Sequence, residues 1–165
     1  LFRDTVRRFI AEHVTPHHQA WEAAGEVPRA LWHEAGRLGL LCCNVPEAFG
    51  GMGGDFLHST ILVEEFAAAG ATGPTFYLQS DIIAPYLVDF GSEEQKQRWL
   101  PRMASGEVVA ALGMSEPSGG SDVQAMRTQA VRDGDDYVIN GQKVFISLVR
   151  QAKHIVTADR NRTTR

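Results

Sequence analysis

The sequence predicts an α+β fold in which an all-α helical domain precedes the start of an antiparallel, β-barrel-like domain. Apolar residues recur at helical spacing over roughly the first hundred residues. After Gly106 the pattern changes to short apolar and β-branched runs, and Gly-containing turn sequences separate those runs. We therefore expect a helical domain over residues 1–106 and a partial β domain over residues 107–165.

Five or six helices are expected in the first domain, each bounded by proline, glycine or a capping residue. The clearest candidates cover residues 2–14, 28–38, 56–69, 79–90 and 93 to about 101 or one turn later. Pro16 ends the first of them, and Pro28 suits the first turn of the second. Ser92 and Gln95 form the Ser-x-x-Gln pattern of a capping box, which fixes the start of the last helix.

The second domain contains short runs that are typical of strands. They cover residues 108–114, 128–132, 137–139, 142–146 and 155–158. Turns are expected at Asp133-Gly134-Asp135 and at Asn140-Gly141. Asn-Gly between extended runs is a strong hairpin signal, because both central residues of a type I′ turn need positive φ. These turns predict antiparallel pairing.

Composition and charge exclude several classes of protein. The 165 residues carry a net charge of −4, and basic residues cluster only at the end, at Arg160, Arg162 and Arg165, which we interpret as a solvated terminus; we therefore expect no nucleic-acid partner. We expect no membrane span, because no apolar run approaches the roughly 18 residues that one requires. Cys42 and Cys43 are adjacent and rarely bridge in that arrangement, which fits a reducing compartment. No secretion signal and no metal-ligand spacing are evident either.

The segment most informative about function is GMSEPSGGSDVQA at residues 113–125. It combines a strand end, hydroxyl side chains, a glycine pair and a carboxylate. Glycines allow a ligand to approach the backbone closely, so the segment could bind a flat polar ligand. On composition alone, a surface loop with capping Ser and Asp residues fits the segment better.

This segment resembles the signature of the acyl-CoA dehydrogenases, and every required position matches. Other family motifs follow in the right order: LGL at 38–40, VPE at 45–47, FGG at 49–51, the Gly-x-x-x-Gln-Lys helix at 91–101 and NGQKVFIS at 140–147. The chain is thus similar to the N-terminal helical domain and the first part of the middle domain of this family.

The resemblance implies an enzyme that uses FAD to convert an acyl-CoA to a trans-2-enoyl-CoA and passes electrons to an electron-transferring flavoprotein. The implied cofactor-binding residues are Leu112, Gly113, Met114, Ser115, Gly120, Ser121, Phe145, Ile146 and Ser147. Among these, Ser121 would also contact the CoA part of the substrate, Phe145 would pack on the isoalloxazine ring, and Ser147 would donate toward flavin N5. A homo-oligomer (dimer or tetramer) in the bacterial cytoplasm or the mitochondrial matrix is implied as well.

The resemblance places the catalytic base outside these 165 residues. In the family a glutamate of the C-terminal helical domain removes the α proton, and we expect that domain to be absent and this chain alone to be inactive. Glu116 matches a structural residue of the family. From Leu148 onward the sequence departs from the family pattern. An acyl-CoA oxidase or flavin monooxygenase on the same scaffold, or a non-catalytic subunit that completes a partner's flavin site, remain alternatives.

Overall fold

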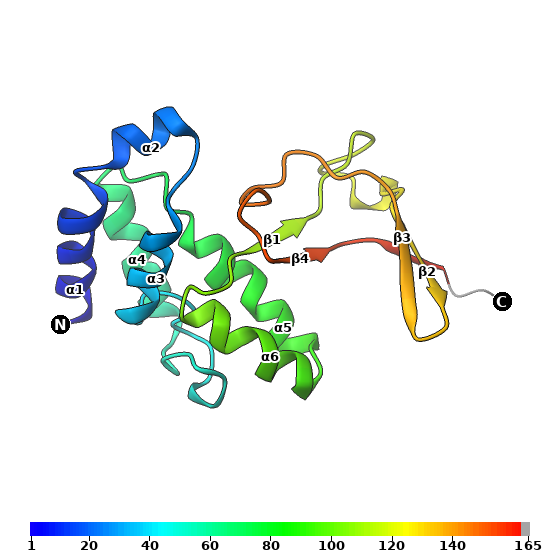
Figure 1. Cartoon of the computed structure of the whole chain (residues 1–165), viewed down its shortest axis with the longest axis horizontal. Helices are drawn as coiled ribbons and strands as arrows, with labels where there is room; N and C mark the ends of the chain where they lie inside the picture. The colour runs from blue at the N-terminus through cyan, green and yellow to red at the C-terminus, as the bar shows by residue number, and fades with distance from the viewer. Residues whose placement is uncertain (163–165) are drawn as a thin grey trace. The chain divides into compact units, whose positions relative to one another are not determined.

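The computed structural model describes residues 1–162 and consists of two compact units, Leu1–Val109 and Ala110–Arg165 (Figure 1). The first unit contains the α-helices and the second contains the strands. The predicted α+β class, with helices first, is confirmed. The barrel-like arrangement of the second domain stays a prediction.

The helical elements of the first unit follow the predicted order. They are α1 (Phe2–Phe9), the π-helical η1 (Ile10–Val14), α2 (His18–Ala24), α3 (Arg29–Arg37), the 3-10 helix η2 (Glu47–Phe49), α4 (Phe56–Ala68), the π-helical η3 (Leu78–Ile83), α5 (Ala84–Phe90) and α6 (Glu93–Ala104). Sequence reasoning missed α2, which buries none of its residues and so shows no apolar periodicity. Among residues 1–162, no helix is both long and apolar enough to cross a membrane.

The capping box predicted for α6 is present. The Ser92 hydroxyl accepts from the Gln95 amide at 3.2 Å, and the Gln95 side chain accepts from the Ser92 amide at 2.9 Å. The helix continues through Pro101 and ends at Ala104, one turn beyond the proline. Pro28 lies at the N-cap of α3 rather than within its first turn. Local sequence signals therefore fix these helix ends to within a turn.

Aromatic side chains form the centre of the helical core. Trp32 and Phe9 on α3 and α1 are almost fully buried, as is Phe76 just before η3. The Phe76 ring meets the Trp32 ring edge-on at 4.8 Å and the Phe66 ring of α4 at 5.7 Å. Edge-to-face geometry is favourable for aromatic pairs. The contacts join helices that lie far apart in the sequence.

The adjacent thiols Cys42 and Cys43 are buried in the loop that follows α3. The Cys42 backbone has φ of 52°, and its amide donates to the Ser80 hydroxyl at 2.9 Å. Burial raises the pKa of each thiol to about 12. Both cysteines are free, in agreement with the predicted absence of a bridge between them.

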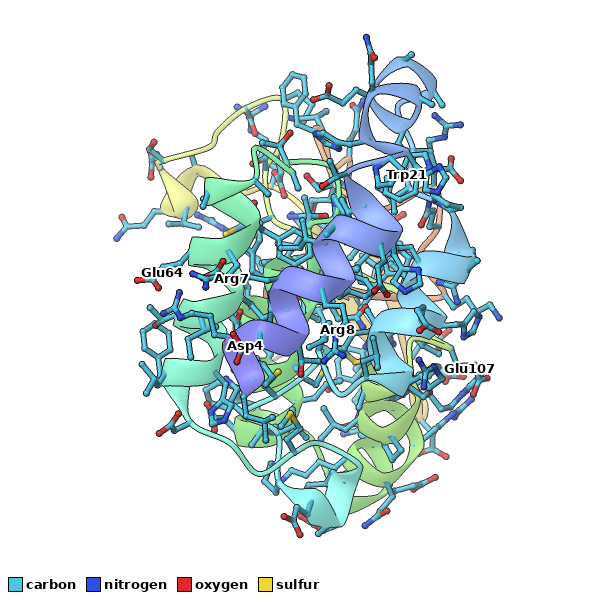
Figure 2. The ribbon with its side chains drawn as sticks, turned by 90° about the vertical axis from the view of Figure 1, so that its left-hand side faces the viewer. Asp4, Arg7, Arg8, Trp21, Glu64 and Glu107 are labelled. Atoms are coloured by element: carbon cyan, nitrogen blue, oxygen red, sulfur yellow. The ribbon has the colours of Figure 1, made fainter. Side chains whose placement is uncertain are left out.

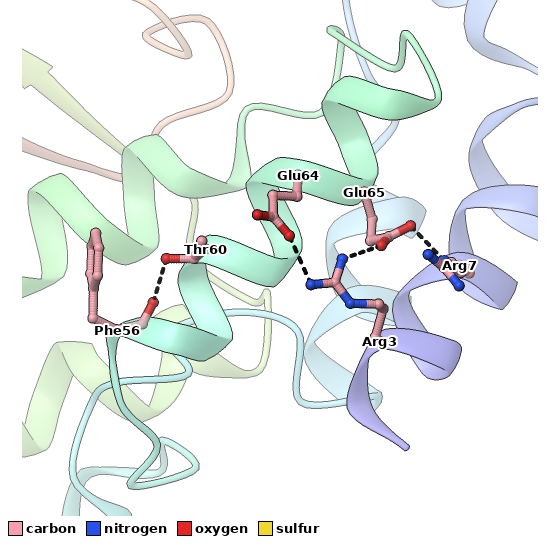
Figure 3. Close-up of polar contacts among 6 residues, drawn as sticks. All are labelled: Arg3, Arg7, Phe56, Thr60, Glu64 and Glu65. Atoms are coloured by element: carbon pink, nitrogen blue, oxygen red, sulfur yellow. Dashed lines mark hydrogen bonds and ion pairs between the residues drawn. The ribbon is translucent and has the colours of Figure 1, made fainter.

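Charged side chains tie α1 to α4 at the edge of the core. Figure 2 views this unit with α1 toward the reader, and Figure 3 shows the contacts. Glu65, which is 8% exposed, accepts from Arg7 at 2.7 Å and from Arg3. Arg3 also donates to Glu64 at 2.7 Å, on the exposed side of α4. Hydrogen bonds from Arg7 and Arg3 lower the pKa of Glu65.

Replacing Glu65 by Ala should destabilise the helical unit more than replacing Glu64 by Ala. The first change leaves two guanidinium groups without their shared acceptor beside the core, whereas the second removes one exposed contact. Urea unfolding followed by far-UV circular dichroism checks this order of midpoints. Equal midpoints for the two variants would show that the buried carboxylate adds nothing to the link between α1 and α4.

The second unit contains one small parallel pair of strands and one mixed sheet. Strand β1 (Ala110–Gly113) pairs in parallel with β4 (His154–Thr157). Strand β2 (Gln129–Asp133) lies between β3 (Asp136–Asn140), antiparallel to it, and β5 (Arg160–Arg162), parallel to it. The 3-10 helix η4 (Val123–Ala125) precedes β2. The prediction of an antiparallel unit holds for β2 with β3 and is wrong for the rest of the described strands, because β1 with β4 and β2 with β5 pair in parallel.

The hairpin predicted at Asp133-Gly134-Asp135 is present, and Gly134 has φ of 63° between the paired Asp133 and Asp136. Glycine adopts this left-handed conformation without a steric cost. The prediction of a hairpin at Asn140-Gly141, with a strand over residues 142–146, is wrong. Asn140 ends β3, and the segment that follows bonds to the end of β1 instead of folding back: the Val144 amide donates to the Ser115 carbonyl, and the Lys143 side chain donates to the Met114 carbonyl.

Candidate functional site

Two segments that the motifs single out lie together in the second unit. The Val144 amide donates to the Ser115 carbonyl at 3.0 Å, and the Lys143 ammonium donates to the Met114 carbonyl at 3.2 Å. The end of β1 is thus bonded to the segment that leads into Phe145 and Ser147. Residues 112–115 and 145–147, expected to share one cofactor site, are held near each other by these bonds.

The Glu116 carboxylate is the anchor of this arrangement. It accepts from the Lys143 ammonium at 2.8 Å, from the Arg127 amide at 2.6 Å and from the Thr128 amide at 3.0 Å. Its side chain is only 3% exposed. Hydrogen bonds from Lys143 foremost, and then from Thr128 and Arg127, lower its pKa to about 2. A carboxylate with such partners serves as a structural anion and is poorly suited to accept a substrate proton.

The β1–β4 pair fixes the base of the site. The Gly113 carbonyl accepts from the Thr157 hydroxyl at 3.2 Å and from the Ala158 amide at 3.0 Å. A Cβ at Gly113 would lie 3.1 Å from the Thr157 hydroxyl, tighter than most real contacts. Leu112, half-buried, is paired with Val156. The segment 113–125 therefore begins at the end of β1, where the backbone is held by hydrogen bonds to β4 and Ala158.

The glycine-rich loop after β1 is exposed. Glu116 and Gly119 exchange backbone hydrogen bonds of 3.0 and 3.1 Å, which turn the chain sharply. Gly120 and Ser121 follow on the surface, and a Cβ at Gly120 would meet no atom within 4 Å. The Asp122 carboxylate caps η4 by accepting from the Gln124 and Ala125 amides. The chain itself leaves open space at Gly120, where a ligand could approach the backbone.

Phe145 has an unusual combination of backbone and exposure. Its side chain is 96% exposed, and its φ is 56°, a conformation uncommon outside glycine. Such strained residues cluster at ligand-binding and active sites. Ser147 is exposed two positions further on, and Ile146 between them is half-buried. This segment therefore presents a bare aromatic ring and a hydroxyl next to the end of β1.

Sequence reasoning did not identify the residues that connect these segments. Lys143 was noted only as part of the motif at residues 140–147, and Thr157 only as part of the strand predicted over residues 155–158. The one available signal was a lysine directly before the apolar residues VFI, at 144–146. A charged residue there indicates a buried partner or an exposed edge, and the structure shows the partner to be Glu116.

Comparison with known proteins identifies the family. The family model of the acyl-CoA dehydrogenase N-terminal domain matches residues 1–107, and the model of the acyl-CoA dehydrogenase middle domain matches residues 111–165. The chain therefore belongs to the acyl-CoA dehydrogenase family, and the predicted resemblance is confirmed.

Individual relatives agree with this membership. Long-chain specific acyl-CoA dehydrogenase of Sus scrofa mitochondria is 50% identical over 147 residues, which cover 89% of this chain and 34% of that protein. The crystal structure of an acyl-CoA dehydrogenase from Geobacillus kaustophilus matches with a TM-score of 0.92 and 42% identity over 96% of this chain and 42% of that one. A glutaryl-CoA dehydrogenase from Mycobacterium smegmatis in complex with FADH2 matches with a TM-score of 0.90 and 30% identity, over 97% and 42% of the two chains. The chain spans about a third of the length of the curated relative.

Acid should weaken the second unit partly through Glu116. Its pKa is about 2 in the folded state and near the ordinary 4.5 in the unfolded state, so its contribution to stability is fully present above about pH 4.5. That contribution is lost as the pH falls toward 2. A Glu116→Gln variant should be less stable than the parent at pH 7, and the gap should narrow as the pH falls from 5 to 3. Unfolding midpoints across this range measure the gap, and a constant gap would contradict the assignment.

Proposed function

We propose that this chain provides one wall of the FAD site of an acyl-CoA dehydrogenase. One observation carries the proposal: the exposed Phe145 ring, on a strained backbone, lies in the segment that is bonded to Met114 and Ser115. A flat aromatic cofactor has the chemistry to cover such a ring, and nearby hydroxyl and backbone groups can bond to its polar edge. The residues present therefore fit a flavin.

Five of the implied cofactor residues can be assigned individual roles. We assign Phe145 to packing against the isoalloxazine ring and the Ser147 hydroxyl to a hydrogen bond toward flavin N5. Met114 and Ser115 would bond to the pyrimidine side of the ring. The remaining members of the wall are Leu112, Gly113, Gly120, Ser121 and Ile146. We also assign Ser121, exposed in the open loop, to contact with the CoA part of the substrate.

The proposed reaction removes the α proton and the β hydride of an acyl-CoA and leaves a trans-2-enoyl-CoA, and bound FAD supplies the hydride acceptor. A hydroxyl donor at Ser147 would stabilise negative charge where it develops. Glu116 has no part in proton transfer, because its oxygens are committed to Lys143 and two backbone amides. The base would be a glutamate of a C-terminal helical domain, and a homo-oligomer would pass electrons to an electron-transferring flavoprotein.

Flavin binding tests the proposal directly. The protein encoded by the whole reading frame that contains this sequence should be yellow and retain FAD after gel filtration. Phe145→Ala should raise the FAD dissociation constant about 3- to 10-fold, since stacking of aromatic rings contributes roughly 0.5–1.5 kcal/mol. Tyr137→Ala, which removes another exposed aromatic ring of the same unit, is the matched control and should bind FAD normally. A parent protein that takes up no FAD would refute the proposed function.

Removal of the Ser147 hydroxyl should affect turnover more than binding. Ser147→Ala should reduce the rate of acyl-CoA-dependent reduction of the flavin by about 10²-fold, because loss of one preorganised donor costs about that much. FAD content should stay near that of the parent. Stopped-flow bleaching of flavin absorbance measures the rate, and an unchanged rate would remove Ser147 from the assigned roles.

A further inference from the structure

Lys143 links the two segments of the proposed flavin wall. Its ammonium donates to the Met114 carbonyl at 3.2 Å and to the Glu116 carboxylate at 2.8 Å, and its side chain is only 14% exposed. It stands two positions before the exposed Phe145. A single side chain thus spans from the segment that carries the aromatic ring to the segment that carries the motif hydroxyl.

The contacts of Glu116 extend this link to a third segment. The carboxylate that receives the Lys143 ammonium also accepts from the Arg127 and Thr128 amides, directly before β2. The start of β2, the end of β1 and the approach to Phe145 therefore meet at one ion pair. Because burial of a charge is costly unless it is paired and hydrogen-bonded, each partner restricts where the other can lie.

The strained backbone of Phe145 explains why such a restriction matters. A non-glycine residue at positive φ persists only where its surroundings hold it in place. Directly before Phe145, the Val144 amide donates to the Ser115 carbonyl, and the Lys143 side chain is anchored at two points. Both neighbours on the N-terminal side are therefore fixed to the residues 114–116, which leaves little freedom for the ring that follows.

We propose that Lys143, paired with Glu116, is a positioning residue that sets the distance and angle between Met114-Ser115 and Phe145-Ser147 in the flavin site. The inference rests on the proposed FAD-binding function and adds a residue to it. Lys143 would touch neither FAD nor substrate, and would act through the two segments that do. Small displacements of binding groups are expensive, since a misplacement of about 1 Å can cost roughly 10²-fold in rate.

The test uses the protein encoded by the whole reading frame, purified with FAD. Lys143→Met should raise the FAD dissociation constant about tenfold, shift the visible flavin spectrum, and lower kcat by about 10²-fold with less effect on KM. Lys143→Arg keeps a cation that can reach the carboxylate and should restore most of each loss. Arg132→Met is the matched control, because Arg132 is a cation of the same unit whose bond to the Gly134 carbonyl lies at the hairpin.

A second variant covers the case in which Lys143→Met does not fold. The double variant Glu116→Gln with Lys143→Met leaves no unpaired charge, which removes the main reason for unfolding. It still lacks the bond to Met114 and should show the same spectral shift and loss of FAD affinity. A double variant with the flavin spectrum and affinity of the parent would overturn the inference.

The outcomes separate this inference from the function on which it rests. A parent that binds no FAD refutes the proposed function, and the positioning role falls with it. A parent that binds FAD while Lys143→Met matches Arg132→Met in spectrum, affinity and kcat refutes the positioning role alone. A spectral shift that Lys143→Arg reverses supports both, because a purely stabilising ion pair would move the unfolding midpoint without changing the flavin spectrum.

Discussion

The buried Glu116 carboxylate is the interaction on which the second unit depends. Three donors from two places in the chain converge on it: the Lys143 ammonium and the adjacent amides of Arg127 and Thr128. Without the carboxylate, the two amides would lose their acceptor and Lys143 would keep only the Met114 carbonyl, at a site that is almost closed to water. The end of β1, the start of β2 and the approach to Phe145 are joined at this carboxylate.

The helical unit also contains a carboxylate that accepts hydrogen bonds from donors far away in the sequence. Glu65 of α4 receives Arg3 and Arg7 of α1 across roughly 60 residues of sequence, at the edge of an aromatic core. In that unit the aromatic side chains form the core, and the ion pairs join α1 to α4 at its edge. In the second unit, strand β3 is exposed along its whole length. There the Glu116 carboxylate joins segments that are distant in the sequence.

The sequence predicted those features that depend only on residues close together in the chain. The Ser92 capping box and the Gly134 turn depend on neighbouring residues, and both are present as predicted. The parallel pairing of β1 with β4 joins residues more than 40 positions apart and has no local signature. Residues 142–146 have the composition of a strand, yet their bonds go to residues 114–116, so the strand prediction failed. The motifs located the candidate site through family resemblance, whereas its Lys143 link could only be seen in three dimensions.

The vicinal thiols of the helical unit have a consequence for handling and for measurement. Burial raises the pKa of Cys42 and of Cys43 to about 12, so both thiols stay protonated at neutral pH, and burial also shields them from reagents. Alkylating reagents and peroxide should therefore spare the native protein. Modification of these two sulfur atoms would occur only when the loop after α3 opens, so the rate of their alkylation reports how often this part of the core becomes accessible to solvent.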